Sequence, residues 1–336
     1  MIVSFLICPN GNGHLFRTID LINFILKKKT NLKINIFCSK KHHLKIHNYK
    51  FSKHKINIFP IIPNYDLRKN TYSQLINLYN LRLSKKVIDE TDIFISDNLI
   101  NKYLPKTNTI LHSNFFWSEV YSSKQNLSKY KNIEKKFLTQ NTYKIISNRY
   151  FGICKQKLNF EKIKIGFTNK NDSKKTKLLT KYKDKKILVY FSGNDLCPDN
   201  LIDKLIQEGY RVYSDNINLL RNNKILKFNR KKNKMENFSY LITKPGLGSI
   251  KDSIKYKILP IFYFKKDNFE YVENFKKLAM IKKIFKNNHL NEEKIFKIVK
   301  NINFLTYKNI LNKLDKFKFD GNQIFWDLLK NYEKKK

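Results

Sequence analysis

The start of the chain decides the fold, because residues 2–26 read IVSFLICPNGNGHLFRTIDLINFIL. The continuous apolar run Ile2–Cys8 predicts a buried strand, and the glycines after it predict a turn. Beyond that turn, apolar residues recur at helical spacing, at Leu15, Ile19, Ile22 and Leu26. A second apolar run, Leu32–Cys38, follows within a short distance. Strand, helix and strand in this order are typical of a βαβ unit, so we expect a parallel sheet.

The same alternation continues along the chain. We predict further strands at 56–60, 93–96, 109–112, 143–147, 186–191, 210–213, 224–228, 238–242 and 258–264, and helices at 72–87, 199–208, 249–256, 269–284 and from 291 onward. Around residues 158–171 the periodicity fails and polar residues take over. The predicted fold class is therefore α/β, with Rossmann-like doubly wound domains at 1–160 and 161–320 and a C-terminal helix and basic tail at 321–336.

Length and composition agree with two globular domains. A length of 336 residues corresponds to about two domains, and 41% hydrophobic residues can form both cores. The cysteines form no C-x-x-C motif, which disfavours a zinc ribbon or a disulfide framework: Cys8, Cys38, Cys154 and Cys197. No apolar run approaches the roughly 18 residues of a membrane span, and the apolar start lacks a basic leader. We therefore expect a cytoplasmic protein.

The charge is strongly basic, with 68 Lys and Arg against 27 Asp and Glu and a net charge of +41. Such a charge favours an anionic partner. However, Lys, Asn, Ile, Phe and Tyr are abundant while Ala279 is the only alanine, as an AT-rich genome would produce without selection for binding. We expect no specific nucleic-acid partner, and we keep an anionic membrane surface as a possible partner. Because only nine glycines occur, glycine clusters are informative.

The first informative cluster is Gly11-Asn12-Gly13-His14-Leu15-Phe16-Arg17, between the first strand and helix. Phe16 stands where the dinucleotide fingerprint G-x-G-x-x-G needs glycine, which excludes that motif. The glycines still allow a ligand to approach the backbone, and the helix start favours an anion. A functional loop is therefore one interpretation, and a tight turn with a capping His14 is the other.

The second cluster is Lys244-Pro245-Gly246-Leu247-Gly248-Ser249, at the start of a predicted helix. Two glycines and a lysine there can hold an anion, and Asp252, one turn later, can accept hydrogen bonds from a ribose diol. The spacing is not that of a P-loop, which disfavours Walker-type phosphoryl transfer. The strand-end loop that begins Ser192-Gly193 is a weaker candidate for the same ligand.

Taken together, these motifs resemble the GT-B glycosyltransferases that include the lipid II-forming N-acetylglucosaminyltransferases. The chain is also similar to the glycosyltransferase-like region of arabinokinase-type proteins, whose kinase half it lacks. This second resemblance rests on Ser96-Asp97, on Ser113-Asn114-Phe115-Phe116-Trp117 with Val120-Tyr121, and on Phe269-Glu270-Tyr271. It covers about residues 1–290, with the motifs in the family's order.

The resemblance implies two Rossmann-like domains that face a cleft, with an acceptor on the first and a nucleotide-sugar donor on the second. It implies metal-independent, inverting transfer of a hexosyl or N-acetylhexosaminyl group in cell-envelope or surface glycan synthesis, without a cofactor. Gly246 and Gly248 would face the diphosphate, Asp252 the ribose, and Glu270 the donor sugar or ribose. The loop with Gly11, Asn12, Gly13 and His14 would face the acceptor and the donor phosphates.

Residue chemistry leaves several alternatives open. His14 and Asp97 are both candidates for the base that deprotonates an acceptor hydroxyl, and an Asx turn is the alternative role for Asp97. We interpret Asn114, Phe115 and Trp117 as wall or core residues. A lysine-rich stretch suggests solvated surface rather than a metal site for its histidines, His42, His43, His47 and His54. A nucleotide-sugar epimerase or hydrolase and a non-enzymatic basic binder remain alternative functions.

Overall fold

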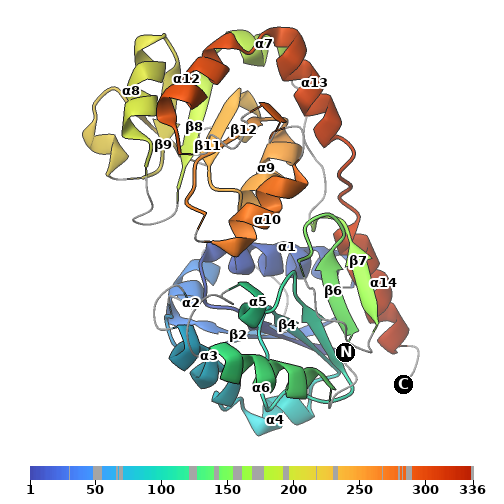
Figure 1. Ribbon diagram of the computed structural model, residues 1–336. Coiled ribbons are helices and arrows are strands. Elements are labelled where there is room, and N and C mark those ends of the chain that lie inside the picture. Colours follow the sequence, from blue (N-terminus) through green and yellow to red (C-terminus); the bar gives the residue numbers. More distant parts are fainter. Residues whose placement is uncertain are drawn as a thin grey trace. The chain divides into compact units, whose positions relative to one another are not determined.

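The chain folds into two compact units. Unit 1 comprises Met1–Lys170 and Lys318–Lys336, and unit 2 comprises Asn171–Phe317 (Figure 1). The computed structural model describes the chain apart from residues 30, 48–54, 66, 68–70, 121–126, 140–143, 154–160, 169–177, 192–196, 217, 230–233, 267, 279–280, 282, 285–289 and 334–336.

Unit 1 is built on a seven-stranded parallel sheet with the strand order β3-β2-β1-β4-β5-β6-β7. Its strands are β1 (Ile2–Ile7), β2 (Lys33–Ser39), β3 (Lys55–Ile62), β4 (Ile93–Asp97), β5 (Thr109–His112), β6 (Lys144–Asn148) and β7 (Lys162–Ile165). Its helices are α1 (Asn12–Lys28), α2 (Lys40–Ile46), α3 (Thr71–Asn80), α4 (Lys85–Asp89), α5 (Trp117–Val120), α6 (Leu127–Thr139) and α14 (Gly321–Glu333).

The strand order of unit 1 reverses beside β1. The chain runs outward from β1 to β2 and β3 and then returns to β4 on the other side of β1, where Ile7 pairs with Asp97. In doubly wound sheets, ligands bind at the carboxyl ends of the strands at such a switch point. This topology places the loop after β1 and the end of β4 side by side at the predicted ligand edge.

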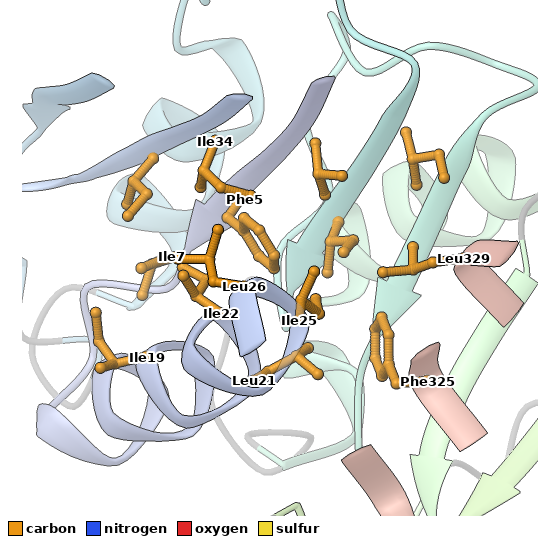
Figure 2. Close-up of a cluster of buried hydrophobic side chains, with 14 of the residues drawn as sticks. Phe5, Ile7, Ile19, Leu21, Ile22, Ile25, Leu26, Ile34, Phe325 and Leu329 are labelled. Carbon is orange, nitrogen blue, oxygen red and sulfur yellow. The ribbon is translucent and has the colours of Figure 1, made fainter. Parts of the chain in front are cut away.

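The core of unit 1 joins the two ends of the chain. Figure 2 shows Ile22, Ile25 and Leu26 of α1 in one apolar cluster with Phe5 of β1 and Phe325 of α14. The segment before α14 is fixed by backbone hydrogen bonds, from Phe167 N to Lys318 O (2.9 Å) and from Gly321 N to Phe167 O (3.1 Å). The C-terminal helix, which the sequence left as a separate segment, is therefore part of unit 1.

Unit 2 has a five-stranded parallel sheet with the order β10-β9-β8-β11-β12. Its strands are β8 (Lys186–Tyr190), β9 (Arg211–Ser214), β10 (Leu226–Lys227), β11 (Tyr240–Thr243) and β12 (Leu259–Phe262). Its helices are α7 (Leu178–Lys183), α8 (Asp199–Gln207), α9 (Leu247–Tyr256), α10 (Phe269–Lys277), α12 (Glu292–Asn301) and α13 (Phe304–Leu314), with 3-10 turns at Leu219–Arg221 and Met235–Asn237. Its switch point lies between β8 and β11, so the loop after β11 is at the ligand edge.

Several boundaries differ from the sequence prediction. The helix predicted at 72–87 is two helices, α3 and α4, because residues 81–84 are not helical and Leu83 is buried there. The unit boundary is at Lys170 rather than 160, because β7 pairs with β6 and extends the first sheet. The prediction missed α2, α5, α6, α7 and β7. Among the helices that the structure describes, none has the length and apolar character needed to cross a membrane.

Candidate active site

The carboxyl edge of the unit 1 sheet brings His14 and Asp97 together. His14 lies in the first turn of α1, and Asp97 is the last residue of β4. The Nδ1 atom of His14 is 3.1 Å from Oδ1 of Asp97. The side chain of Asp97 is only 3% exposed, whereas that of His14 is 15% exposed. Of the two candidate bases, His14 is therefore the more accessible.

Two further residues of α1 complete the surroundings of Asp97. The Arg17 guanidinium forms an ion pair with Oδ1 of Asp97, the same oxygen that faces His14. Thr18 donates its hydroxyl to Oδ2 of Asp97 at 3.2 Å. Both carboxylate oxygens are therefore bound by side chains of the neighbouring helix. The described contacts of Asp97 are therefore those of a site residue bound by α1, rather than those of the Asx turn that was the alternative.

The charge around Asp97 favours its ionised form. Burial alone would raise the pKa of Asp97, but Arg17 and His14 beside it hold that pKa well below its usual range. Because an ionised carboxylate only accepts hydrogen bonds, His14 donates its Nδ1–H to Asp97. In a neutral ring of this tautomer, Nε2 carries the lone pair and can accept a proton.

A second histidine supports the glycine turn before α1. His42 of α2 is 1% exposed, and its Nε2 lies 2.9 Å from the carbonyl oxygen of Gly11. Burial lowers the pKa of His42 to about 4, so the ring is neutral near pH 7. The prediction of a solvated His42 was wrong, because Ser39 caps α2 and α2 turns this ring inward. Gly11 itself has φ 77°, a conformation that favours glycine.

The other residues of this loop lie at the start of α1. Gly13 has open space where a Cβ would be, and Asn12 accepts a hydrogen bond from the Lys45 ammonium at 2.8 Å. The N-cap residue of α1 is Gly11, which has no side chain to accept hydrogen bonds from the first N–H groups of the helix. The local surroundings of this helix start are therefore positive.

A network of buried polar groups holds the strand ends around Asp97. Asn98 has φ 55°, and its carbonyl oxygen accepts a hydrogen bond from Trp117 Nε1 at 2.7 Å. The Asn114 side chain accepts from the backbone N–H of Asn148 at 2.8 Å. Phe115 packs edge-on against Trp117 with ring centroids 5.1 Å apart, and both rings are buried. These residues position the site, and the described contacts assign them to the core.

Glu134 and His112 are site-supporting residues that the sequence did not single out. Glu134 of α6 is 1% exposed and accepts hydrogen bonds from the backbone N–H groups of Trp117 (3.1 Å) and Ser118 (3.3 Å). Burial and the charge of Arg17 lower the pKa of His112 to about 3. The 3-4-3 spacing of Leu127, Tyr130, Glu134 and Phe137 is typical of one helix face and could have predicted α6. The many lysines between these residues made the apolar periodicity weak.

In unit 2, the loop after β11 opens directly into α9. Gly246 is the N-cap residue of α9 and, as a glycine, offers no side chain to cap this helix. A Cβ on Gly248 would meet nothing within 4 Å, so that glycine is not required by internal packing. Backbone N–H groups at such a helix start can bind a phosphate. The loop predicted to bind an anion is thus a glycine-opened helix start, and anion binding there stays a prediction.

Side chains from three elements surround this helix start. Ser249 and Thr243 are joined through their hydroxyls at 3.0 Å, and the Lys244 ammonium lies 5.6 Å from the centroid of the Tyr271 ring. Asn274 of α10 donates to the carbonyl oxygen of Pro245 at 2.9 Å. Asn274, which the sequence analysis missed, therefore holds this loop against α10.

The remaining donor-side candidates are placed as follows. Asp252 lies on α9 and Glu270 on α10, and both are partly exposed. Ser192 and Gly193 lie outside the described residues. Within the part of the chain that the structure describes, no three His, Cys, Asp or Glu residues form a group able to hold a metal ion.

Comparisons with known proteins identify the fold. No family model matches the sequence, and no curated protein matches it. Among solved structures, Arabidopsis thaliana UGT89C1 complexed with UDP-L-rhamnose matches with a TM-score of 0.62 at 13% identity, over 98% of this chain and 97% of that chain. CalG4, the calicheamicin glycosyltransferase, matches with a TM-score of 0.60 at 9% identity and 98% coverage of both chains. The spinosyn forosaminyltransferase SpnP gives 0.61 at 8% identity, over 98% and 99%. The predicted GT-B fold is confirmed.

Proposed function

We propose that this chain with the GT-B fold is a glycosyltransferase, which moves a sugar from a nucleotide-diphosphate sugar to an acceptor hydroxyl. The observation that carries the proposal is the His14–Asp97 pair at the ligand edge of unit 1, with His14 Nδ1 3.1 Å from Asp97 Oδ1. The glycine-opened start of α9 at the ligand edge of unit 2 supports it. UGT89C1, which has the same fold, is described in complex with UDP-L-rhamnose.

In unit 1, His14 acts as the general base. Its Nε2 takes the proton of the acceptor hydroxyl while the hydroxyl oxygen forms a bond to the anomeric carbon of the donor. The bond from that carbon to the diphosphate breaks, and the nucleoside diphosphate leaves with the electron pair. Asp97 orients the ring and stabilises the imidazolium that forms. One displacement of this kind inverts the anomeric configuration.

In unit 2, α9 holds the donor. The N–H groups at Gly246 and Gly248 and the ammonium of Lys244 meet the negative charge of the departing diphosphate. Asp252 accepts hydrogen bonds from the ribose, and Glu270 from the donor sugar or ribose, with Ser192 and Gly193 as further donor contacts. In this proposal the chain's own cations neutralise the leaving group, so transfer needs no metal and continues in EDTA.

The transferred group is a hexosyl or N-acetylhexosaminyl group, and the acceptor is a glycan or a lipid-linked acceptor of cell-envelope or surface glycan synthesis. An anionic inner membrane surface is the proposed site of action. The α2 helix supports this, because Leu44 is 70% exposed and lies between the lysines Lys41 and Lys45. Lys45 also donates a hydrogen bond to Asn12 of the proposed acceptor-side loop, which supports a role for this basic helix near the acceptor.

The deciding experiment is ligand-detected NMR of the purified protein with UDP-, GDP-, dTDP- and CMP-sugars at physiological salt. We expect selective binding of one nucleotide class, and loss of that binding in Asp252→Ala. Asp203→Ala, which removes an exposed acid of α8, is the matched control and should bind like the wild type. Failure of every nucleotide sugar to bind would overturn the proposal.

Chemistry is tested separately from binding. With a donor identified, His14→Gln should retain donor binding and lose transfer by about 10²–10⁴-fold, the usual contribution of a general base. Full transfer activity in His14→Gln would contradict the assignment. Release of free sugar without a glycosylated acceptor would instead identify a hydrolase, and an isomerised nucleotide sugar would identify an epimerase.

A further inference from the structure

The structure assigns to Arg17 a role in setting the charge of the proposed base. We propose that Arg17 is a positioning residue that opposes the electrostatic effect of Asp97 on the His14 ring and so keeps Nε2 of that ring available to accept a proton. This inference rests on the proposed function for its catalytic meaning. The underlying claim, that the opposite charges of Asp97 and Arg17 act on the His14 ring, does not depend on any substrate.

The geometry of three side chains carries the inference. His14 and Arg17 both face Oδ1 of Asp97, and a terminal nitrogen of Arg17 lies 3.4 Å from Nδ1 of His14. One carboxylate oxygen thus serves an imidazole and a guanidinium at once. The three groups are shielded from water, with exposed side-chain fractions of 15% for His14, 13% for Arg17 and 3% for Asp97.

The two charges act on His14 in opposite directions. A carboxylate 3.1 Å from Nδ1 favours the protonated ring, whereas a guanidinium 3.4 Å from the same atom disfavours it. The helical spacing explains the arrangement, because residues three apart on α1 lie on one face. A His–Asp pair without the arginine would hold a proton on Nε2 more tightly and would be a less available base.

The other ionisable groups near this ring do not replace Arg17. Burial keeps His42 and His112 neutral near pH 7. Burial also raises the pKa of the Cys8 thiol far above its usual range, so Cys8 is neutral too. The ammonium of Lys45 is bound to Asn12 rather than to Asp97. Among the described residues, the titratable and charged groups that interact with His14 are Arg17 of α1, Asp97 of β4, His42 of α2 and His112 of β5.

The test is an NMR titration of the histidine rings in the purified full chain, with the His14 signals assigned by their loss in His14→Gln. In Arg17→Gln the pH midpoint of His14 should rise by about one unit or more, and in Asp97→Asn it should fall by a similar amount. In the double variant Arg17→Gln/Asp97→Asn, which leaves no buried charge unpaired, the midpoint should return to within about half a unit of the wild type.

Controls separate charge from structure. Arg17→Lys keeps the charge, so the pH midpoint of His14 should be lower in this variant than in Arg17→Gln. Arg82→Gln removes an exposed arginine and should leave the midpoint of His14 as in the wild type. An unchanged or lowered midpoint in Arg17→Gln, or a double variant displaced by more than about one unit, would overturn the inference. Because no substrate is used, these results are independent of the proposed function. If the His14 midpoints shift as expected but the wild-type protein transfers no sugar, only the proposed function is overturned.

Discussion

At the scale of single residues, the site of unit 1 depends on buried carboxylates in two opposite states. Asp97 is surrounded by Arg17, His14 and Thr18 and stays ionised. Glu134 accepts hydrogen bonds from the backbone N–H groups of Trp117 and Ser118, and burial raises its pKa to about 8. A cation beside a buried acid thus decides whether its negative charge is retained.

Glu134 predicts a pH dependence of stability. Its pKa is about 8 in the folded chain against 4.5 for the unperturbed group. Between these values the folded state keeps a proton that the unfolded state has lost, so the contribution of Glu134 to stability falls as the pH rises. Relative to Glu134→Gln, the wild type should lose on the order of 2–4 kcal/mol between pH 5 and pH 8.

Urea unfolding followed by tryptophan fluorescence measures this effect in unit 1, because both tryptophans, Trp117 and Trp326, belong to that unit. The comparison with Glu134→Gln removes the contributions of all other titrating groups. An equal pH dependence in both proteins would show that Glu134 is ionised in the folded state.

At the scale of elements, a substitution at the start of α9 can test the proposed donor binding without disturbing the fold. Gly248 has a helical backbone and open space at its Cβ position, so alanine fits there. We expect Gly248→Ala to leave unfolding unchanged or to stabilise the chain by up to about 1 kcal/mol. The same methyl group would stand between the helix start and a diphosphate, and should weaken nucleotide-sugar binding by about tenfold or more.

Titration of the donor into Gly248→Ala, with Lys255→Ala near the other end of α9 as the control, checks this expectation. Undiminished donor binding in Gly248→Ala would mean that the diphosphate does not approach this backbone.

The C-terminal helix α14 supports unit 1 at a distance in sequence. Phe325 is fully buried and lies edge-on to His112, with ring centroids 5.4 Å apart. Phe325→Ala should therefore cost about 3–5 kcal/mol, as loss of a buried aromatic ring does. Asn331→Ala, at an exposed position of the same helix, should cost little. The tryptophan-monitored urea transition measures both, and a cost below about 1 kcal/mol for Phe325→Ala would contradict this packing role.

At the scale of the whole molecule, the net charge of +41 predicts salt-sensitive adsorption to anionic surfaces. If the proposed membrane location is correct, the chain should float with vesicles that contain anionic lipid and remain behind with neutral vesicles. Leu44→Ser on α2 should weaken the association beyond the effect of charge, because Leu44 is an exposed apolar side chain. No retention on anionic vesicles at physiological salt would count against a membrane location.

The sequence by itself determined the α/β class, the order of the principal strands and the two glycine-opened helix starts. Apolar periodicity and glycine placement are local signals, and they remain readable despite the biased composition. Only the tertiary structure decided which residues meet. Parallel pairing of β1 with β4 brings His14 and Arg17 to Asp97 across about 80 positions of chain, and packing of α14 joins the C-terminus to unit 1. The tertiary structure also buries His42, although the lysine-rich sequence around it had predicted a solvated surface position. The physical reason is that register and burial arise from contacts between distant segments, which no local pattern encodes.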